Sequence, residues 1–280
     1  MNRYLRLHDP IYTDERPQDL DNLLILDRPD EVGDEGVVYK WSGGKRQPIQ
    51  RLQLLGQGSF KCAYLQLDKR GKATVDSKVV IVVSDLKPDY NMACFEYINR
   101  HSSSVHIPKV KLVGFTNLEA VYTMPRYIAP IPPENDSYQQ FRAIEDCWEE
   151  AQDYLDNLGY LDSEEWDVIY QGDVIRKMTI ECIQVFAQEN PDRIPKSVLR
   201  AITLIEEAVA KIGDTKTLSF DFHDENFATD QDKRLIFLDP LLDLEVLNYP
   251  EEYAEKEGFS EDEAILRMAC VDEGEQFSWF

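Results

Sequence analysis

The most informative part of the sequence reads LSFDFHDENFA over residues 218–228 and resumes as RLIFLDP over residues 234–240. Asp221 is followed five positions later by Asn226, and the apolar run that comes next ends at Asp239. This spacing allows one tight loop to present the first two side chains to the same cleft. Phosphoryl transfer needs a carboxylate that orients the attacking hydroxyl, and oxygen ligands that hold magnesium on the phosphates. We therefore predict that Asp221 is the catalytic carboxylate and that Asn226 and Asp239 are the metal ligands.

A second informative stretch lies upstream and reads LGQGSFKCAY over residues 55–64. Gly56 and Gly58 lie between two expected strands, where residues without a Cβ allow the backbone to approach a triphosphate closely. The two glycines therefore predict a turn that can bind phosphate oxygens. Side chains two apart on a strand share a face, so Lys61 and Ala63 are expected to face the same way.

The order of the two stretches carries a family resemblance. Asp-x-His-x-x-Asn, followed by an apolar strand that ends in Asp, resembles the catalytic loop and metal-binding Asp of the protein-kinase-like superfamily, including its aminoglycoside-phosphotransferase branch. The text is most similar to the serine/threonine protein kinases of T7-like bacteriophages, over roughly residues 50–245. The resemblance implies an α+β, bilobal fold with a small antiparallel-sheet N-lobe and a larger helical C-lobe. It also implies ATP and Mg²⁺ as cosubstrate and metal.

The resemblance further implies a lysine on the phosphates, for which the chain offers two alternatives. The strand Val79–Val83 lacks an internal lysine, whereas Lys61 occupies the third-glycine position of the motif G-x-G-x-x-G-x-V, as in the with-no-lysine kinases. Ala63 then occupies the valine position that covers the adenine in kinases. Lys78 is the competitor by ungapped spacing. Its register would direct Asp76 at the adenine, where burying a carboxylate is costly, so Lys61 is favoured as the catalytic lysine.

Three more positions follow from the same resemblance. Glu96 lies in the helix that carries the lysine-holding carboxylate in protein kinases, and Asp89 is an alternative partner. Met124 falls where the hinge contacts adenine. His223 either lies near the transferred phosphate or bonds to backbone. The remaining histidines show no metal-ligand spacing and are given no role: His8, His101 and His106.

The pattern along the chain predicts three regions. Residues 1–36 form an acidic extension, residues 37–128 an N-lobe of strands with one helix, and residues 129–280 a helical C-lobe with the catalytic loop. Strands are expected at 37–41, 51–55, 62–67, 78–83, 110–115, 120–124 and 235–238, with helical spacing over 88–100, 141–158, 164–188, 198–209 and acidic segments near the C-terminus.

Composition narrows the classes of protein. The net charge is −23, and residues 134–167 carry twelve acids against the single base Arg142. Such a surface disfavours nucleic acid; it either keeps the protein soluble or attracts a basic protein. No apolar run is long enough for a membrane span, the first residues show no secretory pattern, and the five cysteines lack disulfide or zinc spacing. A reducing cytoplasm, that of a host bacterium if the source is a phage, is expected.

The resulting prediction is a serine/threonine protein kinase that acts on host proteins. A small-molecule kinase is the nearest alternative, because the Asp-x-His-x-x-Asn form also resembles that branch. A non-catalytic acidic binding protein is the alternative from another class, although it would have no need of Asp221, Asn226 and Asp239.

Overall fold

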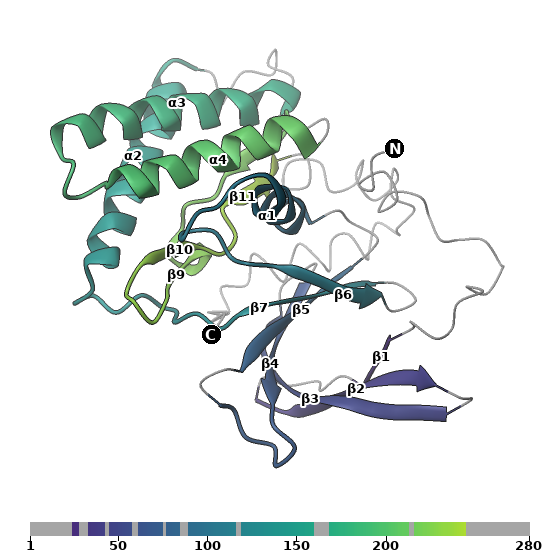
Figure 1. Cartoon of the computed structure of the whole chain (residues 1–280). Coiled ribbons are helices and arrows are strands. Elements are labelled where there is room, and N and C mark those ends of the chain that lie inside the picture. The colour runs from purple at the N-terminus through teal and green to yellow at the C-terminus, as the bar shows by residue number, and fades with distance from the viewer. Residues whose placement is uncertain are drawn as a thin grey trace. The chain divides into compact units, whose positions relative to one another are not determined.

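The computed structural model describes residues 24–27, 33–42, 45–57, 61–74, 77–84, 89–115, 119–159, 168–212 and 216–244. Over these ranges the protein is mixed α+β, with a seven-stranded antiparallel sheet, two small two-stranded sheets and four α-helices (Figure 1). The chain divides into two compact units. The first takes in the described residues up to Asp89 together with Lys109–Arg126, and the second takes in Tyr90–Pro108 and the described residues from Tyr127 onward.

The first unit is built on the seven-stranded sheet, whose strand order is β1-β2-β3-β4-β5-β7-β6. Each neighbouring pair is antiparallel, so hairpins connect most of the strands. The strands are β1 (Leu24–Asp27), β2 (Glu35–Ser42), β3 (Lys45–Gln57), β4 (Lys61–Leu67), β5 (Lys78–Ser84), β6 (Lys111–Phe115) and β7 (Glu119–Pro125).

The central strands are buried on both of their faces. β4 shows an almost continuous run of buried residues, and Val79, Val80 and Ile81 of β5 are at most 5% exposed. Buried β-branched runs of this kind are typical of strands covered on both sides. One face holds an apolar cluster that joins neighbouring strands: Val38, Leu52, Leu54, Cys62, Tyr64, Val80 and Val121.

The sheet extends further than the sequence predicts at its N-terminal edge. The acidic character of residues 1–36 predicts no regular structure there, yet Leu24–Asp27 forms β1 and pairs with residues 37–40 of β2. The strand is short and lies next to charged sequence, so no alternating pattern marks it; backbone pairing with β2 supplies its hydrogen bonds. β3 also begins earlier than expected, and a register shift at Val38 and Tyr39 accommodates it.

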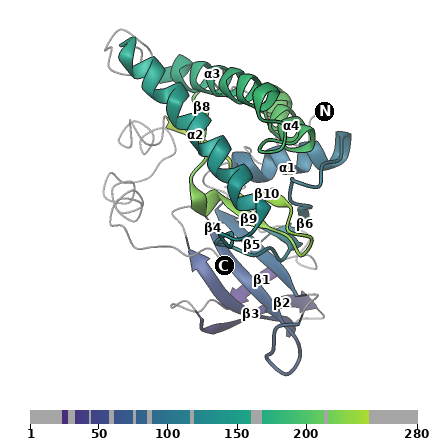
Figure 2. The ribbon, with the colours of Figure 1, turned by 90° about the vertical axis from the view of Figure 1, so that its left-hand side faces the viewer.

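The second unit contains the α-helices and the two small sheets. The helices are α1 (Tyr90–His101), α2 (Asp136–Asn157), α3 (Val168–Glu189) and α4 (Lys196–Ile212). Strands β8 (Leu218–Phe220) and β11 (Leu241–Asp243) pair with each other, as do β9 (Phe227–Thr229) and β10 (Leu235–Phe237). Helix α3 contacts both α2 and α4, and Figure 2 shows these three helices together.

Helix α4 carries the apolar stripe that organises this unit. Its residues at helical spacing are almost completely inaccessible to solvent: Val198, Ala201, Ile202, Ile205, Ala208 and Val209. Beside it, α3 comes unusually close to β8, because a Cβ on Gly172 would lie 2.5 Å from the carbonyl oxygen of Leu218. The buried guanidinium of Arg176 donates to the same carbonyl and pairs with Glu206 of α4 at 2.8 Å, which ties the helices to β8, the strand that precedes the loop at Asp221.

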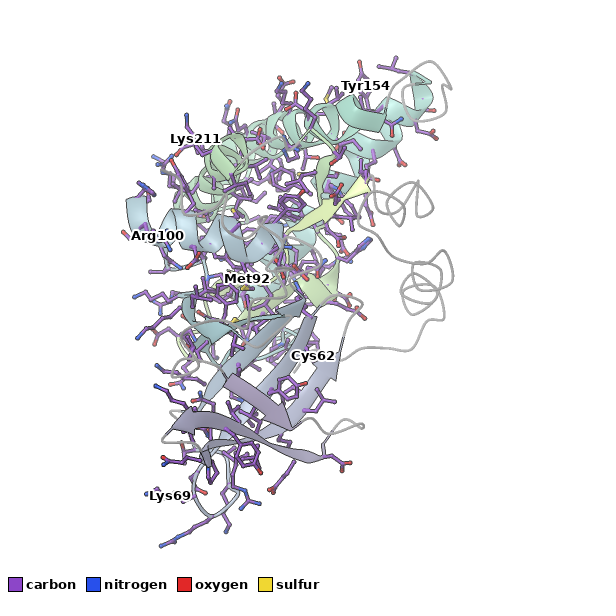
Figure 3. All side chains as sticks on the ribbon, turned by 90° about the vertical axis from the view of Figure 1, so that its right-hand side faces the viewer. Cys62, Lys69, Met92, Arg100, Tyr154 and Lys211 are labelled. Carbon is purple, nitrogen blue, oxygen red and sulfur yellow. The ribbon has the colours of Figure 1, made fainter. Side chains whose placement is uncertain are left out.

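Helix α1 belongs to the helical unit, which differs from the expected grouping of this helix with the sheet. Cys94, Phe95 and Ile98 are buried, and α1 packs on α4. The Asn91 side chain adds two hydrogen bonds of 3.0 Å to the backbone of Leu241. Figure 3 labels Met92 and Arg100 along this helix, the first buried and the second exposed. The unit boundary between Arg126 and Tyr127 lies next to the expected change from sheet to helices.

None of the helices in the described ranges combines the length and apolar character that crossing a membrane requires.

Candidate active site

The segment that carries Asp221 and Asn226 is anchored by buried phenylalanines. Phe220, Phe222, Phe227 and Phe237 are at most 1% exposed, and their ring centroids are 4.5–6.0 Å apart. Aromatic rings at this separation add specific geometry to the burial of apolar area. Because the Phe222 side chain is fully buried, the residues on either side of it, Asp221 and His223, are directed toward the surface.

Hydrogen bonds bring the three predicted phosphotransfer residues together. The Asn226 carbonyl accepts from the backbone N–H groups of Leu238 at 2.8 Å and Asp239 at 3.3 Å. The Asn226 side-chain Nδ2 donates to the Asp221 carbonyl at 3.0 Å, and the Asp221 N–H donates to the Pro240 carbonyl at 3.0 Å. Asp221, Asn226 and Asp239 therefore belong to one closed hydrogen-bonded frame, although eighteen positions separate the first from the last.

The side chains of this frame are partly buried. The Asp221 side chain is 20% exposed, and its Oδ1 lies 3.5 Å from Nε2 of His223. Oδ1 of Asp239 has no contact with solvent. The Asn226 amide donates through Nδ2, so its Oδ1 is the atom suited to a cation. Two carboxylates and an amide oxygen form a donor set of the kind that magnesium accepts.

A magnesium ion that is bound to a nucleotide needs few protein ligands. Among the residues that the structure describes, no group of three or more His, Cys, Asp and Glu side chains is arranged to hold a metal ion. Magnesium in phosphotransferases is bound by one or two carboxylates together with substrate phosphates, rather than by an all-protein cage. Asn226 and Asp239 fit that mode.

His223 projects from the loop, with 61% of its side chain exposed. The Trp148 indole from α2 meets its ring edge-on, with centroids 4.7 Å apart. This contact holds the imidazole beside Asp221. No sequence pattern pointed to Trp148, because it reads as one apolar position on a helix far from the loop in sequence.

The loop and the adjoining face of α2 are strongly acidic. Burial raises the pKa of Glu225, and the charges of Asp224 and Asp221 raise it further. Burial likewise raises the pKa of Glu145 on α2; Arg142 opposes this, while Glu149 and Asp224 add to it. Because the neighbouring carboxylates raise the pKa of Glu225 and of Glu145, these side chains lie close enough to form one field of negative potential.

The residues predicted to bind nucleotide phosphates lie in the first unit. Lys61 begins β4, its side chain is 15% exposed, and Nζ lies 3.6 Å from Oδ2 of Asp89, whose side chain is 8% exposed. Lys61 pairs with Val83, and Ala63, at 1% exposure, pairs with Ile81. The register therefore places the two β4 residues on the same face of the sheet, as their spacing predicts.

The other residues of this unit that are predicted to bind the nucleotide differ in their exposure to solvent. Gly56 is buried and pairs with Ala63, while Gly58 lies outside the described residues. Met124 is 4% exposed and pairs with Val79. Lys78, the alternative lysine, is exposed and pairs with Pro125.

Glu96, predicted to hold the lysine, forms an ion pair with Arg100 one turn along α1, at 3.0 Å. The carboxylate that pairs with Lys61 is Asp89, which the sequence offers as the alternative. The physical reason lies in the chain path: Asp89 immediately precedes α1 and belongs to the same compact unit as Lys61, whereas Glu96 lies within the helical unit.

The comparisons with known proteins return no relative. No model of a known protein family matches the sequence, and no curated protein is significantly similar to it.

Proposed function

We propose that this protein is an ATP-dependent phosphotransferase, and specifically a serine/threonine protein kinase. The observation that carries the proposal is the hydrogen-bonded frame that holds Asp221, Asn226 and Asp239 together. On the same grounds we assign the sheet unit and the helical unit to the N-lobe and C-lobe of a protein-kinase-like fold.

Each residue of the frame has a role that its chemistry allows. Asp221 orients the attacking hydroxyl and accepts its proton, as its partly exposed carboxylate permits. Asn226 and Asp239 hold magnesium, whose charge stabilises the transferring phosphoryl group. The Nδ2 bond from Asn226 to the Asp221 backbone keeps the base and the ligand at a constant separation.

Lys61 is assigned to the ATP phosphates, with Asp89 as its orienting carboxylate. Its ion pair and partial burial favour it over Lys78, because a phosphate-binding lysine needs a fixed ammonium position. Ala63 and Met124 are assigned to the adenine, since both are apolar, buried and on strands whose register connects them through β5.

The acidic field around the catalytic loop favours a protein substrate that carries basic residues near the phosphorylated hydroxyl. Asp224, Glu225, Glu145 and Glu149 contribute negative charge beside Asp221. Such a field attracts the lysine and arginine side chains of a protein substrate.

The test is to incubate the full chain with labelled ATP, magnesium and a bacterial lysate, and to identify labelled residues by mass spectrometry. We expect label on serine or threonine, and a loss of roughly 10²–10⁴-fold in rate with Asp221→Asn, the range for a positioned general base. The control is Asp192→Asn, an exposed carboxylate between α3 and α4, which should leave the rate unchanged. Transfer to aminoglycosides or small alcohols alone would favour the small-molecule kinase. Equal rates in Asp221→Asn and wild type would refute the proposal.

A further inference from the structure

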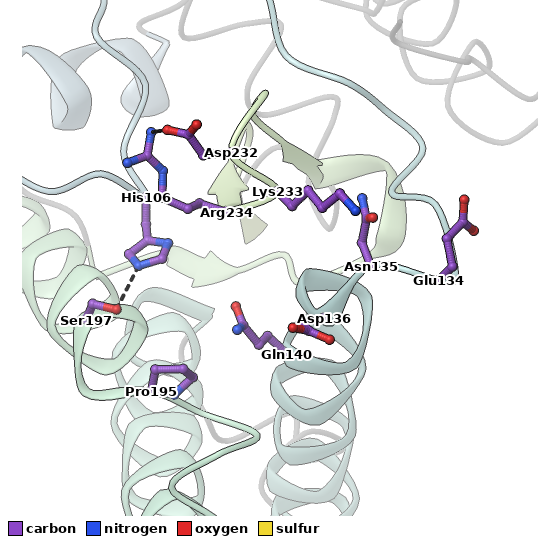
Figure 4. Close-up of a pocket in the computed structure, with 10 residues that line it drawn as sticks. All are labelled: His106, Glu134, Asn135, Asp136, Gln140, Pro195, Ser197, Asp232, Lys233 and Arg234. Carbon is purple, nitrogen blue, oxygen red and sulfur yellow. Dashed lines mark hydrogen bonds and ion pairs between the residues drawn. The ribbon is translucent and has the colours of Figure 1, made fainter.

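A cavity of about 380 Å³ lies in the second unit, apart from the residues assigned to phosphotransfer. It is bordered by the N-terminal ends of α2 and α4 and by the hairpin between β9 and β10 (Figure 4). His106 and Ser197 line one side, and Asn135 and Lys233 line another.

The imidazole of His106 is held in one tautomer. Nδ1 lies 2.7 Å from the carbonyl oxygen of Leu235, which can only accept, so Nδ1 carries the proton. Burial lowers the pKa of His106; nearby Arg234 also lowers it, while the Leu235 carbonyl and Asp230 oppose this. The neutral ring therefore presents a lone pair at Nε2.

That lone pair faces a hydroxyl. Oγ of Ser197 lies 3.0 Å from Nε2 of His106, so the serine O–H donates to the imidazole. Phe237 N–H donates to the His106 carbonyl at 3.0 Å, which fixes the backbone that carries the base. A hydroxyl, a neutral imidazole and a third group that orients the imidazole form the arrangement that activates a serine nucleophile.

Ser197 also lies in the first turn of α4, a helix of 17 residues. The N–H groups of Val198 and Leu199 donate to the Pro195 carbonyl, at 2.9 and 3.1 Å. The N–H groups that precede them have no acceptor within the helix, and the helix dipole is positive at this end. Negative charge that develops on an oxygen beside Ser197 is stabilised there.

The opposite side of the cavity is also polar. Asn135, which is 7% exposed, and Lys233 both line it. An amide and an ammonium group can each donate a hydrogen bond to an oxygen atom of a ligand. Lys233, at φ 60°, lies beside Asn135 on the hairpin (Figure 4).

We propose that this cavity is a second, hydrolytic site, in which Ser197 is the nucleophile, His106 the general base, and small carboxylic esters with a polar acyl group the substrates. Asn135 and Lys233 bind the polar end of the acyl group.

The reaction proceeds in two balanced steps. Ser197 Oγ bonds to the ester carbonyl carbon while its proton passes to Nε2 of His106, and the C–O bond to the alcohol breaks as that proton is returned to the leaving oxygen. Water then attacks the acyl-serine with His106 again as base, which releases the carboxylic acid and restores the hydroxyl.

The test uses the full chain and two probes, a fluorophosphonate and p-nitrophenyl acetate. Attack on the fluorophosphonate forms an Oγ–P bond and expels fluoride, so intact mass and peptide mapping should place the adduct on Ser197. We expect labelling roughly 100-fold faster than at other exposed serines, the low end of general-base activation. Ser197→Ala should abolish labelling and ester turnover, whereas Ser102→Ala, at the end of α1, should change neither. Kinase activity should persist in both.

A pH profile of the wild-type protein tests His106 without a variant. The labelling rate should rise with pH, with its midpoint below pH 6.5, because only neutral His106 accepts the proton. The ionisable groups facing the cavity besides His106 are Glu134 and Asp136 at the start of α2, Asp232, Lys233 and Arg234 on the hairpin, with Asp230 beside them; none is a second imidazole. A labelling rate that does not fall at any pH below 6.5 while the protein stays folded, an adduct spread over many serines, or ester turnover retained in Ser197→Ala would overturn the proposal.

Discussion

Replacing Lys61 with Met tests whether its ion pair with Asp89 serves the nucleotide or only the fold. At 3.6 Å and an effective dielectric constant of about 20, the attraction is roughly 5 kcal/mol, which the desolvation of both groups largely offsets. We expect a net loss of about 2 kcal/mol and a fall in Tm of roughly 4–8 °C. Phosphotransfer should fall by at least roughly 100-fold, because no other cation would replace the ammonium. Lys78→Met, at an exposed position on the same sheet, should change neither quantity by much.

The double variant Lys61→Met with Asp89→Asn separates the two roles. Removing the isolated carboxylate should restore most of the Tm, because the uncompensated charge is gone, but activity should stay low. Thermal unfolding and labelled-ATP transfer at saturating magnesium measure the two quantities. If activity returned together with Tm, or if Lys78→Met were the more damaging variant, the assignment of Lys61 to the phosphates would be wrong.

Two further predictions concern stability. Phe222→Ala should reduce the free energy of unfolding by about 3–5 kcal/mol, because the ring is fully buried among Phe220, Phe227 and Phe237; a urea midpoint equal to that of wild type would contradict this packing. His106 has a lowered pKa, so the folded protein binds fewer protons than the unfolded chain below pH 6.5, and stability should fall as the pH drops from that value through the folded pKa. In His106→Gln, the free energy of unfolding should no longer fall with pH in this way. Glu145 and Glu225 have raised pKa values and act in the opposite direction, but they contribute equally to the variant and to wild type. An equal pH dependence of stability in the two proteins would exclude His106 as its source.

The strands and helices of the described residues could largely be read from local patterns. Alternation and β-branched runs predict β2 to β7, and helical spacing predicts α1 to α4, because each pattern reflects one face buried against a core. The misses have a common cause. β1 and the three-residue strands β8, β9 and β11 are too short to show a period, and only pairing with a partner strand defines them.

The candidate site, too, could be predicted only in part from local patterns. The residue types and spacing of Asp221, Asn226 and Asp239 are present in the sequence, since loop chemistry is a local property. The amino-acid sequence cannot show that the Asn226 carbonyl accepts hydrogen bonds from the backbone N–H groups of both Leu238 and Asp239. These bonds depend on how β9 pairs with β10.

The mixed α+β class, the acidic character and the residue types of the loop from Asp221 to Asn226 follow from the amino-acid sequence alone, because these depend on periodicity, charge and short-range spacing. Tertiary structure alone decided that Lys61 pairs with Asp89 rather than with Glu96, and that His106 meets Ser197 from 91 positions away. The physical reason is that such partners are selected by packing between elements distant along the chain, and no local pattern encodes which elements will pack together.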